Sequence, residues 1–296
     1  MRLLLELKRR GTIAAVAEAL HFSPSGVSQQ LILLENEVGV KLLERIGRGV
    51  RLTEAAEVLA DYAERILTEL EQAETEVRAV EGQVRGTVRI ASFQTAGLAL
   101  ITHMLDVLAH ETLLRIELTQ AEPERALPAL LAREFDLMIG EEYPGVPQSV
   151  SRDVHRVDLC EDAMRLALPQ DLPALKGTLD TEDGDIGIGH AADIPWVMEA
   201  PGSLSRTWAT ALCRAAGFEP NVQFESEDML LHRELAQRGH AAALVPAMLD
   251  TAIAGAPVTY PIGQSRTVFT AVRYGSESHP ALMAVRAALA DAAQHL

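Results

Sequence analysis

The sequence predicts an α/β protein that begins with a small helical head and a long connecting helix. Three observations support this fold class. Apolar residues recur at helical spacing through residues 1–38, and a stretch without proline follows at residues 54–82. From residue 86 onward, short apolar runs alternate with amphipathic stretches, as expected where strands alternate with helices. The 296 residues are enough for two domains.

The composition excludes several classes of protein. The chain is 48% hydrophobic and 23% charged, which is typical of a globular protein, and no apolar run reaches the roughly 18 residues of a membrane span. The apolar part of MRLLLELKRRG is too short for a signal peptide, so we expect a cytoplasmic protein without a membrane partner. The motifs expected for a cofactor or a metal are missing, and Cys160 and Cys213 are expected to be unlinked thiols.

The charge is distributed unevenly along the chain. The net charge of −16 argues against a nucleic-acid partner. However, residues 1–53 carry eight Lys/Arg and five Asp/Glu, a net charge of +3. Residues 54–85 carry three Lys/Arg and nine Asp/Glu, and the rest of the chain carries fifteen Lys/Arg and twenty-eight Asp/Glu. The head is therefore the net-basic segment, and a nucleic-acid partner is expected there.

The head is predicted to be a helix-turn-helix. Gly11 ends a first short helix, and Thr12 has the residue type preferred at the N-cap of a second. In HFSPSGVSQQLILLENEVGV, Ser23 is a suitable N-cap for a third helix, with a buried stripe of apolar residues. The outward face of this helix carries Pro24, Ser25, Ser28 and Gln29. Glutamine can bond an adenine edge and serine can bond a base or a phosphate, so this face is predicted to contact DNA.

A basic hairpin is predicted after the third helix. In VKLLERIGRGVRLT, Arg45, Arg48 and Arg51 alternate with glycines and apolar residues, which suits a wing that lies against the DNA backbone or the minor groove. Each piece alone has an ordinary structural explanation, because a Ser-Pro pair is usually a helix cap and three arginines are usually a solvated loop. Their order and spacing together favour DNA binding.

These segments resemble the winged helix-turn-helix of LysR-type transcriptional regulators. The matching segments are GTIAAVAEALHFSPSGVSQQLILLE, VGVKLLER and RGVRLTEAA, within residues 1–56. The sequence departs from the family at Gly26, where Ala or Pro is more usual, and at Ala56, where glycine commonly stands. The resemblance implies a DNA-binding regulator that contacts DNA through Ser23, Pro24, Ser25, Ser28, Gln29, Arg48 and Arg51.

The connecting helix has a narrow apolar seam close to a heptad repeat. Its members are Ala55, Leu59, Tyr62, Ile66, Leu70, Ala73, Val77 and Val80. We expect this seam to pair with a second copy, giving a homodimer whose two heads read a near-palindromic operator in double-stranded DNA. The alternative is a helix that lies on its own C-terminal domain.

The body is predicted to bind a small molecule. Ligands in α/β folds lie where strands end and helices begin, and three turns, ASFQTAG, LTQAEP and EAPGSLSR, have polar residues at such places. For any single residue, an ordinary helix cap is the more frequent explanation. The resemblance implies a two-lobed, periplasmic-binding-protein-like (type 2) effector domain. Its effector would lie between the lobes, near Ser92, Gln94, Thr95, Gln120, Gly202 and Ser203.

The expected division is a DNA-binding domain at residues 1–56, a linker helix at 57–85 and an effector domain at 86–296. Lobe I would comprise about 86–160 and 262–296, and lobe II about 161–261. The resemblance implies a homotetramer built from linker dimers. An α/β enzyme or binding protein without DNA function is the alternative.

The effector is expected to be an organic acid or an amino acid. Acidic residues that could lie near the cleft would favour an amine-bearing ligand, unless they simply belong to an acidic surface. They are Glu122, Glu141, Glu142, Glu199, Glu225 and Asp228.

Overall fold

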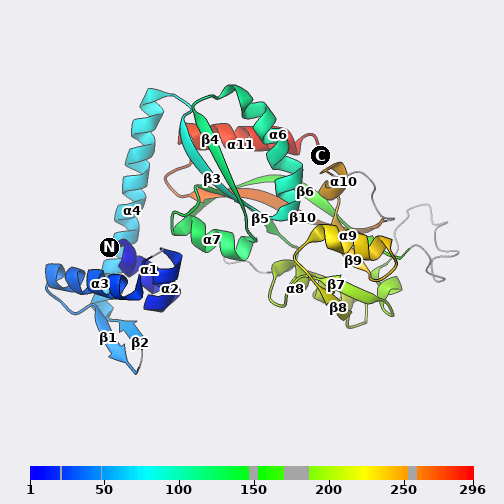
Figure 1. Cartoon of the computed structure of the whole chain (residues 1–296), viewed down its shortest axis with the longest axis horizontal. Helices are drawn as coiled ribbons and strands as arrows, with labels where there is room; N and C mark the ends of the chain where they lie inside the picture. The colour runs from blue at the N-terminus through cyan, green and yellow to red at the C-terminus, as the bar shows by residue number, and fades with distance from the viewer. Residues whose placement is uncertain (21, 48, 147–152, 170–186, 253–258) are drawn as a thin grey trace.

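A computed structural model describes residues 1–20, 22–47, 49–146, 153–169, 187–252 and 259–296 (Figure 1). Figure 1 shows the head at the lower end of a long helix that runs along one side of the body. No helix in these described ranges is both long and apolar enough to cross a membrane.

The head contains three helices and a two-stranded hairpin. They are α1 (Arg2–Arg10), α2 (Ile13–Ala19), α3 (Pro24–Val38), β1 (Leu43–Ile46) and β2 (Gly49–Leu52). Both predicted caps are confirmed: Thr12 Oγ1 accepts from Ala15 N at 3.1 Å, and Ser23 Oγ accepts from Gly26 N at 3.0 Å. One side of each helix contributes to a single apolar core, which includes Leu4, Leu7, Val16, Val27, Leu31 and Leu42.

Helix α4 (Glu54–Glu81) has two different faces. One face is buried against the head and the body; it holds Ala56, Ala60, Ala63, Glu71 and Thr75. The other face carries most of the predicted seam and is open to solvent in the single chain, with Tyr62 53%, Leu70 52% and Val80 89% exposed, whereas Leu59 packs against the core of the head. Both expectations for this helix therefore find support, because it lies on its own body with one face and leaves the other uncovered.

The body is built on a six-stranded sheet with the order β4-β3-β5-β10-β6-β9. The strands are β3 (Gly86–Ser92), β4 (Leu114–Gln120), β5 (Leu137–Glu142), β6 (Val154–Ala167), β9 (Ala243–Pro246) and β10 (Thr259–Arg273). Strand β3 is parallel to β4 and β5, whereas β10 is antiparallel to β5 and β6. Alternation of strands with helices favours parallel strands, and β3, β4 and β5 are parallel. The long strands β6 and β10 depart from this pattern, because they pass between the two ends of the sheet as an antiparallel pair.

The two ends of the sheet carry different helices. At the β3 and β4 end lie α5 (Gln94–Ala96), a π-helical turn (Gly97–Ile101), α6 (Thr102–Val107), α7 (Pro123–Leu131) and α11 (Pro280–Ala293). At the β9 end lie β7 (Pro195–Met198), β8 (Asn221–Glu225), α8 (Leu204–Ala215) and α9 (Met229–Gln237). Helix α10 (Met248–Ala252) follows β9, and its Met248 packs into the apolar core of the β3 and β4 end. We call these two groups lobe I and lobe II. Each has its own apolar core, and the predicted crossover positions, 160 and 262, lie within β6 and β10.

Candidate DNA-binding and effector sites

The N-terminal end of α3 presents polar side chains to solvent. Pro24, Ser25 and Gln29 are exposed, as is Gln30 beside them, which the sequence analysis did not include. Ser28 is half-buried, and its hydroxyl donates to the Pro24 carbonyl at 2.9 Å. The predicted contact face therefore exists on the surface of the head, with glutamine amides as its longest polar groups.

The N-cap of α3 explains why glycine stands at position 26. Ser23 Oγ accepts from the Gly26 amide and lies 3.1 Å from Ser25 Oγ. A Cβ added at Gly26 would lie 3.1 Å from the same Ser23 Oγ, closer than most such contacts. A larger residue would therefore require Ser23 Oγ to shift by a few tenths of an ångström.

The predicted wing is the antiparallel pair β1–β2, in which Arg45 lies opposite Val50. Arg45 and Arg51 are exposed, and Arg51 forms an ion pair with Glu44 at 2.9 Å. Arg48, the third predicted wing arginine, lies outside the described residues. The exposed guanidinium groups leave this hairpin suited to phosphate contacts.

Buried Glu35 ties the wing to α3. Its Oε1 accepts from the backbone N–H groups of Leu42 at 2.9 Å and Leu43 at 3.1 Å. Burial acts to raise the pKa of Glu35, but these two donors and the charge of Lys41 together lower the pKa below its usual range. Glu35 was not among the predicted residues, although its place four positions after buried Leu31 on one helix face was a signal.

The arginines of α1 contact the end of α7 in the body. Arg9 donates to the Leu131 carbonyl at 3.4 Å and pairs with Glu64 of α4 at 2.8 Å. The Ala132 carbonyl accepts from Arg2, and the Pro128 carbonyl accepts from Arg10 at 3.5 Å. Because the carbonyls at a helix C-terminus carry partial negative charge, cations are favoured there.

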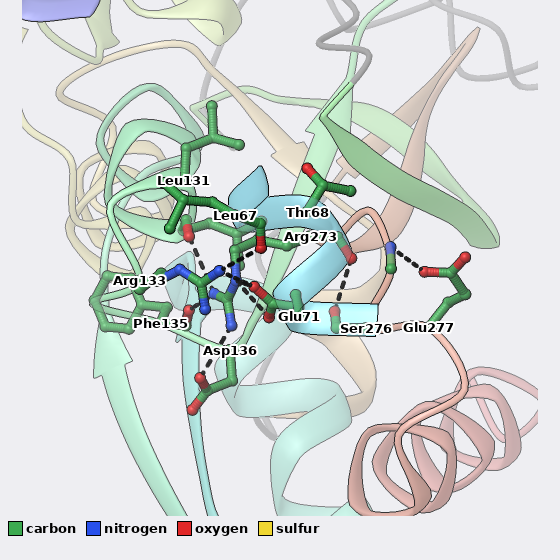
Figure 2. A network of polar contacts seen from close by, with 12 residues as sticks. Leu67, Thr68, Glu71, Leu131, Arg133, Phe135, Asp136, Arg273, Ser276 and Glu277 are labelled. Atoms are coloured by element: carbon green, nitrogen blue, oxygen red, sulfur yellow. Dashed lines mark hydrogen bonds and ion pairs between the residues drawn. The ribbon is translucent and has the colours of Figure 1, made fainter. Parts of the chain in front are cut away.

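A buried carboxylate of α4 joins the linker helix to the body (Figure 2). Glu71 pairs with Arg133 at 2.6 Å and with Arg273 at 2.8 Å, and its side chain is 8% exposed. Arg273 also donates to the carbonyls of Phe135 at 2.5 Å and Leu130 at 3.1 Å. The two arginines thus connect the middle of α4, the end of α7 and strand β10.

The residues predicted for the effector site lie between or near the lobes, but several of their polar groups already form hydrogen bonds with other groups of the protein. Ser92 is buried and donates to the Phe93 carbonyl, and buried Thr95 accepts from Arg266 at 2.8 Å. Gln120 is exposed at the end of β4. Gly202 and Ser203 precede α8, where Ser203 is the N-cap.

Two side chains of lobe I contact helix starts in lobe II. Gln94 Nε2 donates to Asp228 at 2.8 Å, and Gln94 Oε1 accepts from Met229 N at 2.8 Å. Glu124 accepts from Leu204 N at 2.8 Å. The helix N-termini that could hold an anion are therefore bonded to protein groups in this structure.

A small cavity lies in lobe II where it faces lobe I. Its volume is about 30 Å³, comparable with the space of one water molecule. Residues that line it include Tyr143, Trp196, Met198, Glu199, Ser205 and Trp208. Of these six, Glu199 was expected near the cleft as an acid, whereas the aromatic and apolar lining was not predicted, because it comes from separate strands and helices and carries no shared motif. Arg266, which also lines the cavity, links it to predicted Thr95.

Carboxylates gather at this lobe boundary. Burial and then the charge of Glu199 raise the pKa of Glu122 to about 8. Burial also raises the pKa of Glu199 to about 7, against hydrogen bonding from Ser205. The positive charge of Arg266, by contrast, is already paired with two carboxylates, those of Glu141 and of Asp162, the latter at 2.8 Å. Three of the six acidic residues proposed to lie near the cleft therefore form one electrostatic group.

The described residues also include two free thiols and a cluster of possible metal ligands. Cys160 and Cys213 are free, and burial raises the pKa of their thiols to about 11 and about 12, so both are poor nucleophiles at neutral pH. His103, Asp291 and His295 could act as metal ligands, because their ligand atoms lie within 4.8 Å of one another. All three are at least partly exposed, on α6 and next to the end of α11.

Comparison with family models agrees with this architecture. The LysR substrate-binding domain matches residues 81–294, and the helix-turn-helix of bacterial regulatory proteins of the lysR family matches residues 1–57. The chain belongs to the LysR family.

Curated members of the LysR family are similar over much of the chain. The Klebsiella aerogenes nitrogen assimilation regulatory protein Nac is 30% identical over 77% of this chain and 85% of its own length. The Escherichia coli DNA-binding transcriptional dual regulator OxyR is 27% identical over 78% of this chain and 73% of its own length. ClcR of Pseudomonas putida is 32% identical over 52% of this chain. The match covers about half of the length of ClcR, 53%. These relatives are transcriptional regulators, so the enzyme alternative is not supported.

Solved LysR-family structures share the fold. A full-length OxyR variant from Pseudomonas aeruginosa superposes with a TM-score of 0.63 at 20% identity, covering 99% of this chain and 93% of that one. CbnR in complex with its target DNA gives a TM-score of 0.53 at 21% identity, covering 99% and 98%. The predicted combination of winged helix-turn-helix, linker helix and two-lobed effector domain is confirmed.

Proposed function

We propose that this LysR-family chain is a cytoplasmic regulator that binds a near-palindromic operator and changes its DNA binding when a small molecule binds between the lobes. The observation that carries the DNA-binding part is the exposed Ser/Gln face at the start of α3, on the net-basic head. We assign residues 1–56 to DNA binding, 57–85 to the linker and 86–296 to effector binding, with lobe I at about 86–160 and 262–296.

The exposed seam of α4 supports dimerisation. Large apolar side chains, among them Ile66 at 49% and Val77 at 68% exposure, lie on the face of α4 that no part of the described chain covers. Pairing two seams would remove this apolar area from water and place two recognition helices on opposite half-sites. Further contacts between bodies would join two such dimers into a tetramer.

The contacts between lobes support regulation by a ligand. Gln94 and Glu124 of lobe I hold the starts of α9 and α8 in lobe II, next to the cavity that Glu199 and Trp208 line. A ligand that binds better to one arrangement of the lobes will shift the protein toward that arrangement. Ser92, Gln94, Thr95, Gln120, Gly202 and Ser203 remain our proposed set around this region.

Selection from a random duplex library with the full-length protein tests the function. We expect enrichment of an inverted repeat whose half-sites lie about one helical turn apart or a multiple of it. A fluorescence titration of the enriched duplex against a shuffled duplex, at two salt concentrations, then separates base recognition from phosphate binding. Equal affinity for both duplexes at both salt concentrations would contradict the proposal.

A further inference from the structure

Carboxyl groups gather at and near the cavity of lobe II that faces lobe I. Glu199 lines the cavity, and its charge raises the pKa of Glu122 nearby. In the part of the chain that the structure describes, neither carboxylate has an ion-pair partner. The two arginines that line the cavity are already engaged by acids: Arg266 by Glu141 and Asp162, and Arg206 by Glu225.

Two partly buried carboxylates without a counter-ion among the described residues are costly for the protein when they ionise. Burial is the main cause of the raised pKa values of about 8 at Glu122 and about 7 at Glu199. A positively charged group placed between them would favour both charged forms, whereas an anion would add repulsion. The electrostatics of the cavity therefore select the sign of the ligand's charge.

An independent feature indicates where the rest of a ligand would lie. Trp208 is 2% exposed and lines the same cavity, yet its indole Nε1–H has no acceptor among the described residues. A buried donor without an acceptor is unfavourable, and an oxygen on a ligand would satisfy it. Tyr143 packs against Trp208 with ring centroids 5.0 Å apart, so the wall beside this donor is aromatic.

We propose that the effector is a small organic cation. Its ammonium or amidinium group lies between Glu199 and Glu122, and its apolar body, with an oxygen acceptor, lies against Trp208 and Tyr143. This inference rests on the proposed effector site and adds the class of ligand. Since the cavity holds only about 30 Å³ here, the lobes separate to admit the ligand and the Gln94 and Glu124 contacts change with it.

Isothermal titration of the full-length protein with matched ligands tests the charge. Tyramine, tyrosol and para-hydroxyphenylacetate share one phenolic body and differ in being a cation, a neutral alcohol and an anion. Isobutylamine, isobutanol and isobutyrate form a smaller set without the phenolic oxygen. We expect each amine to bind at least about tenfold more tightly than its neutral and anionic counterparts, and tyramine to bind more tightly than isobutylamine.

Two variants place the binding at the cavity. Glu199→Gln is expected to weaken tyramine binding by about tenfold or more while tyrosol binding stays as in the parent. Glu219→Gln removes the same charge from the exposed surface of lobe II, where Glu219 pairs with Arg214, and is expected to leave tyramine binding unchanged. Glu122→Gln provides a second test of the cavity, and near-UV circular dichroism confirms that each variant is folded.

Three outcomes would overturn the inference. They are tighter binding of an anion than of its amine, unchanged tyramine binding in both Glu199→Gln and Glu122→Gln, and no binding of either amine at millimolar concentrations. Tight binding of an anion would still leave a ligand-binding site between the lobes, and operator selection is measured without any ligand. Failure of the cation class is therefore distinguishable from failure of the proposed function.

Discussion

Glu71 of α4 and Arg273 of β10 are separated by 202 residues of sequence, and Glu71 Oε1 accepts from Arg273 Nε at 2.8 Å. Arg133 binds the other carboxylate oxygen at 2.6 Å (Figure 2). One side chain of the linker helix is therefore the shared partner of two body arginines, and the position of α4 against the body depends on it.

Removing this carboxylate should destabilise the chain. Glu71→Ala removes the acid that two largely buried guanidinium groups share, and Arg273 keeps only a longer pair with Asp136 at 3.4 Å, so we expect the free energy of unfolding to fall by about 3 kcal/mol. Urea unfolding measures the change. Glu74→Ala, at an exposed position of the same helix, is the control and should stay within about 0.5 kcal/mol of the parent. Similar losses in both variants would assign the effect to helix propensity.

Gln29 should contribute to base recognition. Gln29→Ala is expected to weaken binding to the selected operator by about 1–3 kcal/mol, because a bidentate contact to a base edge would be lost. Binding to shuffled DNA and the dependence on salt should hardly change. Asn36→Ala, at an exposed position near the other end of α3, is the matched control. An equal loss on shuffled DNA would show that Gln29 contacts phosphate instead.

The seam of α4 should hold the dimer. Leu70→Glu places a charge in the centre of the seam, and we expect a large shift toward monomer in sedimentation velocity at micromolar protein. Ala79→Glu adds the same charge to the same helix at an exposed position outside the seam and should keep the parent's mass. If Leu70→Glu also keeps that mass, the dimer contact lies elsewhere.

Glu122 should make stability depend on pH. Its pKa rises from 4.5 to about 8 on folding, so the folded state binds the extra proton between these values. The stability contributed by this group is complete below pH 4.5 and is lost as the pH rises through 8. Glu122→Gln stays neutral, so we expect it to match the parent at pH 4 and to exceed it by about 2 kcal/mol at pH 9, after allowance for solvent screening.

Chemical denaturation at both pH values checks this prediction. The groups that face Glu122 are Glu199, Glu141, Glu124 and Glu227, all acids, so their ionisation acts in the same direction. Glu69→Gln, on the exposed surface of α4, is the control and should follow the parent at both pH values. A Glu122→Gln variant that loses its advantage as the pH rises would reverse the assigned sign.

The head could be predicted closely from the sequence because its signals are local. The caps at Thr12 and Ser23 lie within three residues of the amides that they bind, and the polar face of α3 follows from helical spacing alone. The apolar seam of α4 was recognisable for the same reason. Its opposite face was not, because Glu71 resembles any surface glutamate until the arginines from residues 133 and 273 are placed beside it.

The effector region could be predicted only in outline. The sequence indicated turns at helix starts, and the structure bonds one of them, the start of α8, to Glu124 of lobe I. Gln94, from another of these turns, bonds to the start of α9, which was not among them. The cavity itself depends on how β7, α8 and the long strands come together, which no local pattern encodes. Glu199 was noticed as an acid near the cleft, but its proximity to Trp208 required the packed fold.

Helix α7 connects lobe II with the head within one chain. Its first turn carries Glu124, bonded to lobe II, and its last carbonyls accept from the arginines of α1, about 13 Å away along nine residues. A short helix of this kind moves as a unit, so a displacement by the ligand at one end reaches the head without crossing to another subunit. A monomeric variant such as Leu70→Glu should therefore still change the orientation of its head when ligand binds.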